Sequence, residues 1–172
     1  MKQTYRFSCA LGVLAALAPM AQASGTHAHG HGAGIGQAGE AAHVDREIAI
    51  SMNEMHFTPG SLMVHAGETI RFLITNEGRA VHEFNLGTEE MWAEHRDEMR
   101  EMMHAGMMTM RMINHDRMAE AGMMHDDPNS LLLAPGESGE IIWTFPEVTE
   151  MGFACNIPGH FEAGMHGQVQ FE

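Results

Sequence analysis

The chain has 172 residues and is strongly acidic, with 23 Asp and Glu residues against 9 Lys and Arg and a formal net charge of −14. This charge argues against a nucleic-acid partner and against anionic membrane surfaces, and it favours cations or basic proteins as partners. The length allows one domain with a proper hydrophobic core.

Residues 1–23 have the pattern of a secretory signal peptide. Lys2 and Arg6 give a positive start, residues 11–17 are apolar, and the small residues Ala21 and Ala23 mark a cleavage site after Ala23. We therefore predict export to the periplasm. The apolar run is shorter than the ~20 residues that cross a bilayer, so no membrane span is expected after cleavage. A retained N-terminal anchor is the alternative.

Signal cleavage would leave the protein with a single cysteine. Cys9 lies in the signal peptide, so Cys155 alone would remain and no internal disulfide could form. In an oxidising compartment a lone thiol is a liability unless it is buried or holds a metal. Both explanations are open for Cys155 at this point.

Residues 24–45 are predicted to form a His-rich flexible tail. They hold His27, His29, His31 and His43 among Gly and Ala, with almost nothing large and apolar to bury. Histidines in such a tail can bind copper, because imidazole is the commonest metal-binding side chain. The alternative is a low-complexity spacer.

Short apolar runs bounded by turn residues fill residues 46–172, the segment that we predict to be the folded domain. About seven strands at this spacing predict an all-β fold, a sandwich or barrel of Greek-key type. The predicted strands are residues 48–52, 61–64, 69–75, 83–86, 140–145, 152–155 and 167–171.

Residues 88–130 interrupt this pattern as a Met-rich insertion. Thr88 followed by Glu89 and Glu90 predicts a helix cap with an acidic first turn, so one or two helices are expected. The helical spacing of some methionines is that of an ordinary core, but thioethers also prefer Cu(I), so additional cuprous ions or a soft docking surface are the competing interpretation. The insertion holds Met91, Met99, Met102, Met103, Met107, Met108, Met110, Met112, Met118, Met123 and Met124.

The most specific pattern lies near the C-terminus, where Cys155, His160 and Met165 recur at intervals of five. A strand ending at Cys155 and a loop returning into the next strand would turn all three side chains toward one point. Thiolate, imidazole and thioether are the ligands that select copper, in a His₂Cys site with a long axial Met. His82, at the start of a distant strand, is the candidate for the second histidine.

An early strand-edge histidine followed far downstream by Cys-x₄-His-x₄-Met resembles the blue-copper proteins, or cupredoxins, over about residues 48–172. Residues 66–72, 81–84 and 157–160 are similar to the plastocyanin and azurin-like branch. The resemblance implies a Greek-key cupredoxin β-sandwich that holds one Cu(I)/Cu(II) ion, with His82, Cys155 and His160 as equatorial ligands and Met165 as the weak axial ligand. The Met-rich insertion and His-rich tail are similar to those of the CopI-type periplasmic copper-tolerance cupredoxins.

Neighbouring polar residues are assigned less specifically. His166 follows Met165 and should point to the opposite face of an extended segment, so we leave it out of the ligand set. His56 and His65 are expected to be surface or core residues. Glu83 and Glu162 could support the ligands or simply be solvated.

Two functions fit these features. The first is copper tolerance or homeostasis, in which the protein binds, buffers or passes on periplasmic copper at a redox-active mononuclear centre, with another copper-handling or redox protein as a partner. The alternative is an electron carrier for a periplasmic redox enzyme, which would need neither the tail nor the insertion. Enzymatic activity is not expected, because Met165 fills the axial position and related folds that act as oxidases use several copper sites across two or more domains.

Overall fold

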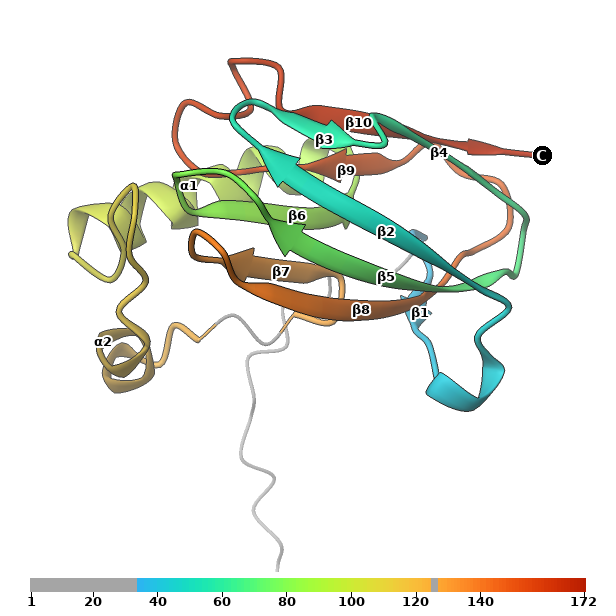
Figure 1. Ribbon diagram of the computed structural model, residues 1–172, viewed down its shortest axis with the longest axis horizontal. Helices are drawn as coiled ribbons and strands as arrows, with labels where there is room; N and C mark the ends of the chain where they lie inside the picture. Colours follow the sequence, from blue (N-terminus) through green and yellow to red (C-terminus); the bar gives the residue numbers. More distant parts are fainter. Residues whose placement is uncertain (1–33, 125–126) are drawn as a thin grey trace, which may run out of the picture.

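Two five-stranded sheets pack face to face in the computed structural model, which describes residues 34–124 and 127–172 (Figure 1). The first sheet has the order β1 (Gln37–Ala38), β8 (Ser138–Thr144), β5 (Thr69–Asn76), β2 (Arg46–Asn53) and β3 (His56–Thr58). The second has the order β4 (Ser61–Val64), β10 (His166–Phe171), β9 (Gly152–Ala154), β6 (His82–Gly87) and β7 (Ser130–Leu133). This arrangement confirms the predicted all-β sandwich.

Alternating apolar residues build the core between the two sheets. In β5, Ile70, Phe72 and Ile74 are all buried, as the two-residue period of a strand with one face on the core requires. Phe72 meets Phe84 of β6 across the sandwich, with ring centroids 5.5 Å apart. This contact packs β6 of the second sheet against β5 of the first, and Phe153 of β9 packs in the same way against Phe57 of β3, with ring centroids 5.1 Å apart.

The seven predicted strands are all present, with boundaries that differ by at most two residues. Three further strands, β1, β3 and β7, were not predicted. They are short, and β1 contains no large apolar residue whose alternation would have marked it.

The structure corrects the predicted flexible tail for residues 34–45. Ile35 is 2% exposed, and its carbonyl oxygen accepts a hydrogen bond of 2.9 Å from Trp143 Nε1. β1 pairs with β8, and a short 3-10 helix, η1 (Ala41–His43), follows. One buried isoleucine and backbone pairing attach this segment to the sandwich. The signal peptide and the tail histidines at positions 27, 29 and 31 lie outside the described residues.

The Met-rich insertion forms two helices, α1 (Glu89–His104) and α2 (His115–Ala121), which confirms the helical prediction. Thr88 caps α1 by accepting a hydrogen bond from the Met91 amide, and Gly122 follows α2 with a left-handed φ of 68°. Among the described residues, neither helix has the length and apolar composition needed to span a membrane.

Helix α1 covers the outer face of the second sheet, so that every residue of β6 is buried. Phe84 of β6 faces the core, whereas its neighbour Glu83 faces α1 and contacts His95. A strand with only one covered face would leave Glu83 in water. The insertion therefore changes the environment of a residue that is directly adjacent to His82.

Candidate metal centre

The four predicted copper ligands come from one end of the second sheet (Figure 1). His82 begins β6, Cys155 immediately follows β9, and His160 and Met165 lie in the loop that leads into β10. Strands β6 and β9 are antiparallel neighbours, so the start of one lies beside the end of the other. All four residues are at most 1% exposed.

The structure brings His82, Cys155 and His160 together with their donor atoms in contact range. Cys155 Sγ lies 3.9 Å from His82 Nδ1 and 3.3 Å from His160 Nδ1. One potential ligand atom from each residue lies within 4.8 Å of the others. Both imidazoles thus turn a ring nitrogen toward the sulfur, which is the arrangement that a shared metal ion requires.

Met165 is held in the same buried loop by main-chain hydrogen bonds. Its carbonyl oxygen accepts a bond of 3.0 Å from the Cys155 amide, and its own amide donates to the His160 carbonyl at 3.0 Å. The His160 amide in turn donates to the Ile157 carbonyl. These bonds close the loop on itself and bring the backbone of Met165 beside that of Cys155.

Burial determines the protonation of the metal-free site. It lowers the pKa of His82 to about 4, helped by the nearby His160, and it also lowers the pKa of His160. Burial raises the pKa of the Cys155 thiol to about 12. At neutral pH both imidazoles are therefore neutral and can offer a lone pair, whereas the thiol must lose its proton when a metal binds.

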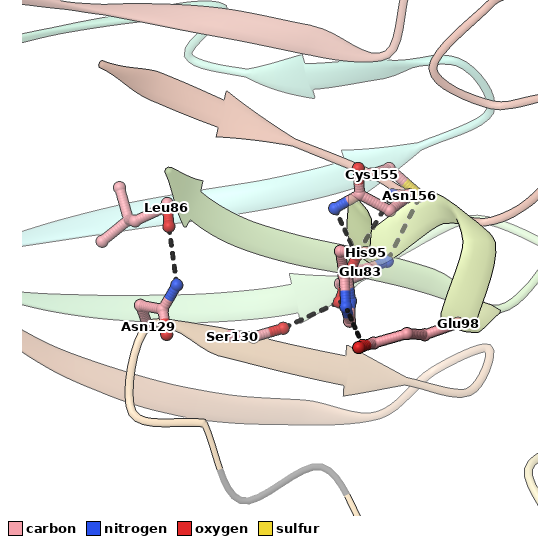
Figure 2. A network of polar contacts seen from close by, with 8 residues as sticks. All are labelled: Glu83, Leu86, His95, Glu98, Asn129, Ser130, Cys155 and Asn156. Atoms are coloured by element: carbon pink, nitrogen blue, oxygen red, sulfur yellow. Dashed lines mark hydrogen bonds and ion pairs between the residues drawn. The ribbon is translucent and has the colours of Figure 1, made fainter. Parts of the chain in front are cut away.

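A buried polar network links this site to α1. We call it the Glu83 network; Figure 2 shows its members Glu83, His95, Glu98, Ser130 and Asn156. Glu83 is fully buried, and its carboxylate accepts hydrogen bonds from both the backbone and the side chain of Asn156, at 3.1 and 2.9 Å. The Glu83 amide donates to Cys155 Sγ at 3.4 Å. Glu83 is therefore not solvated, and it contacts the backbone and side chains beside two of the predicted ligands.

The remaining members of this network were missed by the sequence analysis. His95 and Glu98 stand on a helix with many charged residues, and Ser130 and Asn156 are ordinary polar positions. No periodicity or motif marks them. Their contacts depend on how α1 lies across the sheet and on which strands lie beside β6, which spacing along the chain does not encode.

The other candidate residues lie at the surface. His166 is exposed whereas Met165 is buried, which confirms that the two point in opposite directions. His56, His65 and Glu162 are also exposed. His43, the one tail histidine within the described residues, has a 73% exposed side chain near Glu40.

The methionines of the insertion divide into two groups. Most of them pack. Met99, Met102, Met107, Met108 and Met118 are at most 6% exposed and belong to the hydrophobic core, and Met91, Met103 and Met123 are partly buried against it. A second group is open to solvent, with exposed fractions of 43% for Met110, 66% for Met112 and 46% for Met124. Core packing thus explains the first group, and only the second has thioethers accessible from outside.

Comparison with known proteins places this geometry in context. The family model of the copper-binding proteins of the plastocyanin/azurin family matches residues 44–172. The "Copper-resistant cuproprotein CopI" of Pseudomonas aeruginosa is 45% identical over 170 residues, which cover 92% of this chain and 91% of that protein. The protein of the same name from Rubrivivax gelatinosus is 40% identical over 147 residues, covering 85% of this chain and 78% of that one.

Solved structures show the same fold. Auracyanin B has a TM-score of 0.57 at 20% identity and covers 80% of this chain and 96% of its own. The dithionite-reduced auracyanin of Roseiflexus castenholzii has a TM-score of 0.53 at 22% identity, covering 75% of this chain and 98% of its own. At this level of identity the likeness concerns the fold alone.

Proposed function

Because this chain belongs to the plastocyanin/azurin family of copper-binding proteins and is a cupredoxin of the CopI type, we propose that it binds copper and contributes to copper resistance. The observation that carries this proposal is the buried group of His82, Cys155 and His160, whose donor atoms converge within 4.8 Å. Two neutral imidazoles and a thiol match the preference of copper for nitrogen and soft sulfur donors.

We assign His82, Cys155 and His160 as the three strong ligands and Met165 as the weak axial ligand. The assignment is supported by the two Nδ1 atoms that face Cys155 Sγ and by the depressed pKa values that keep both imidazoles neutral. Cys155 would bind as the thiolate, because a bound cation lowers the pKa of its ligand. Copper held here would supply one-electron exchange between Cu(I) and Cu(II).

The chain itself contributes a preformed and dry site. The amide of Cys155 is bonded to Met165, the amide of Met165 is bonded to His160, and the Glu83 amide donates to the ligand sulfur. These bonds are made by the chain itself, so they would hold the ligand loop in place when copper binds. Burial of all four side chains excludes water from the ligands.

Copper handling in the periplasm is the physiological role that we favour. Residues 1–23 would direct export, and the folded domain would then bind, buffer or pass on copper outside the cytoplasm. The two relatives are both named copper-resistant cuproproteins, which supports copper handling over electron transfer as the main role. Copper ions are the expected partner, together with a periplasmic protein that delivers or receives them.

Electron transfer is the second candidate. The main-chain bonds that fix the ligand loop favour it, because a rigid site that suits both oxidation states changes little when an electron moves. A catalytic role is not proposed, because Met165, as the assigned axial ligand, would fill the fourth position of the metal.

Additional copper would bind at the open thioethers of the insertion and at the tail histidines. Met110 is the best placed, because its carbonyl oxygen accepts a 2.8 Å bond from the Val81 amide, next to His82. Met110 and Glu54 also line a surface pocket of about 560 Å³. A thioether and a carboxylate at this pocket would concentrate copper beside the ligand-bearing end of the sandwich.

The role is tested by growth of a copper-sensitive bacterium that expresses the full chain, its Cys155→Ala variant or a Met110→Leu/Met112→Leu/Met124→Leu triple variant. We expect the wild type to raise the tolerated copper concentration and Cys155→Ala to lose most of that gain. The triple variant should retain part of it if the open methionines only assist the buried site.

The electron-transfer alternative predicts a different pattern. Wild type and Cys155→Ala would then give equal copper tolerance, and only the respiration of a redox partner would fail in the variant. Equal tolerance in these two strains, at equal protein levels in the periplasmic fraction, would therefore contradict copper handling as the main role.

A further inference from the structure

Glu83 is a fully buried carboxylate that stands between a proposed copper ligand and the inserted helix α1. Resting on the proposed copper site, we propose that α1 positions the copper ligands through His95 and Glu83, so that the Met-rich insertion and the metal centre act as one unit. His95 and Glu83 are positioning residues in this account. Neither of them would touch the copper.

Glu83 joins the two strands that carry ligands. It directly follows His82 in β6, and its Oε2 accepts hydrogen bonds from the amide and the side chain of Asn156, which directly follows Cys155. Its own amide donates to Cys155 Sγ. The position of this one side chain therefore sets how the Cys155 segment lies against His82.

His95 holds the other oxygen of the same carboxylate. Its Nε2 lies 2.8 Å from Glu83 Oε1, and Ser130 Oγ donates to that oxygen at 2.8 Å as well. His95 Nδ1 lies 3.1 Å from Glu98, a second residue of α1. A buried carboxylate is costly unless it is paired and hydrogen-bonded, so Glu83 depends on the helix for its position.

The charge state of His95 fits this role. Burial alone would lower its pKa, but the carboxylates of Glu83 and Glu98 outweigh that effect and raise the pKa to about 9. The imidazole is therefore cationic at neutral pH and neutralises Glu83 beside the ligand sulfur. A neutral partner at position 95 would leave a buried negative charge only a few atoms from Cys155.

A second contact ties α1 to the ligand loop independently of Glu83. The Arg96 guanidinium lies 4.2 Å from the centre of the Phe161 ring, and the Trp92 ring lies 6.0 Å from the same ring. Phe161 directly follows the proposed ligand His160. Helix α1 thus contacts the residue after His82, through Glu83, and the residue after His160.

Because of these contacts, the structure of the proposed copper site depends on the insertion. Deleting it would expose Glu83 and free Phe161, and the copper centre would change even if the insertion bound no metal. Conversely, a change in the position of α1 would reach Cys155 through the Glu83 network.

The test compares the signal-cleaved wild type with His95→Gln, Ser130→Ala and the control His104→Gln, an exposed histidine at the end of the same helix. Hydrogen exchange of the Asn156 amide is measured by NMR in the copper-free proteins. The thiolate-to-copper absorption band and the electron paramagnetic resonance spectrum are measured after loading with Cu(II).

We expect His95→Gln to speed exchange of the Asn156 amide at least about tenfold, because the bond to a charged acceptor is weakened. Its copper band should also shift, whereas His104→Gln should leave both signals unchanged. Ser130→Ala keeps the ion pair between His95 and Glu83 and loses one hydrogen-bond donor, so it should give smaller changes in the same direction. If His95→Gln does not fold, Ser130→Ala tests the proposal in its place.

Unchanged exchange at Asn156 together with an unchanged copper spectrum would overturn the proposal, even if His95→Gln lowers the melting temperature, because the network would then be structural only. If the wild type itself shows no thiolate-to-copper band, the proposed copper site fails and this inference fails with it. A normal wild-type band with unaltered variants contradicts the positioning role alone.

Discussion

His95 Nε2 lies 2.8 Å from Glu83 Oε1, and the two side chains are 11% and 0% exposed. A histidine from an inserted helix thus forms a shielded ion pair with a carboxylate that adjoins the proposed metal site. Neither residue belongs to the sequence motif that indicated the proposed copper ligands. The contribution of the pair to the free energy of unfolding can be measured without any metal.

The stability of the copper-free protein should depend on pH through His95. The folded pKa of about 9 exceeds the unfolded value of 6.5, so folding binds this proton more tightly. The resulting stabilisation is complete below pH 6.5 and is lost as the pH rises through 9. Its size is of the order of 3 kcal/mol. Urea unfolding at pH 6 and pH 9.5 measures it.

The matched variant for this prediction is His95→Gln, which has no titrating group at position 95. Its free energy of unfolding should change less than that of the wild type between the two pH values, because other titrating groups contribute equally to both proteins. Identical pH slopes for the two proteins would show that the ion pair carries no such stability.

The methionines of the insertion should differ sharply in their contribution to stability. Met99 is fully buried in the core, so Met99→Ala removes packed volume and should cost about 2–5 kcal/mol. Met110 is 43% exposed, and Met110→Ala should cost less than about 1 kcal/mol. Thermal and urea unfolding of the two variants check this, and equal losses would contradict the division into packed and open methionines.

The attachment of residues 34–45 rests on a close backbone approach at Gly36. A Cβ atom there would lie 2.3 Å from the Thr144 carbonyl oxygen, whereas one at Gly34 would meet nothing within 4 Å. Both glycines have a left-handed φ, so Gly34→Ala is a matched control for backbone strain. Gly36→Ala should destabilise the protein by roughly 1–3 kcal/mol more than Gly34→Ala. Similar unfolding midpoints would show that the segment is not held there.

Met165→Leu should preserve copper binding and raise the reduction potential. Leucine fills a similar volume in this buried position but donates no lone pair, and a less donating, more apolar site disfavours Cu(II) relative to Cu(I). Voltammetry of the loaded protein measures the shift, with exposed Met63→Leu as the control. An unchanged potential would argue against Met165 as the axial ligand.

The main features of this protein were readable from residue patterns that have a local physical cause. Alternating apolar residues marked the long strands, and Thr88 with its two glutamates marked the start of α1. The spacing of Cys155, His160 and Met165 indicated a loop that folds back on itself, because ligands of one ion must lie close together. Such patterns can be recognised in a single sequence.

Features that depend on the packing of distant segments were not readable. Met99, Met103, Met107 and Met110 share one helical face by spacing, but α1 ends at His104. Beyond that end Met107 is buried and Met110 is exposed, which helical spacing does not predict. Residues 34–45 have one large apolar side chain and looked flexible. The Glu83 network joins residues up to 73 positions apart, and its contact with His95 forms because α1 lies over β6.

A titration of the protein without residues 1–23 with Cu(II), followed by visible absorption and electron paramagnetic resonance, tests the proposed copper site. Cys155→Ala is measured in parallel. We expect an intense thiolate-to-copper band that saturates at one equivalent in the wild type and is absent from the variant. Copper bound only in weak, colourless sites, equally in both proteins, would contradict the assignment of His82, Cys155, His160 and Met165.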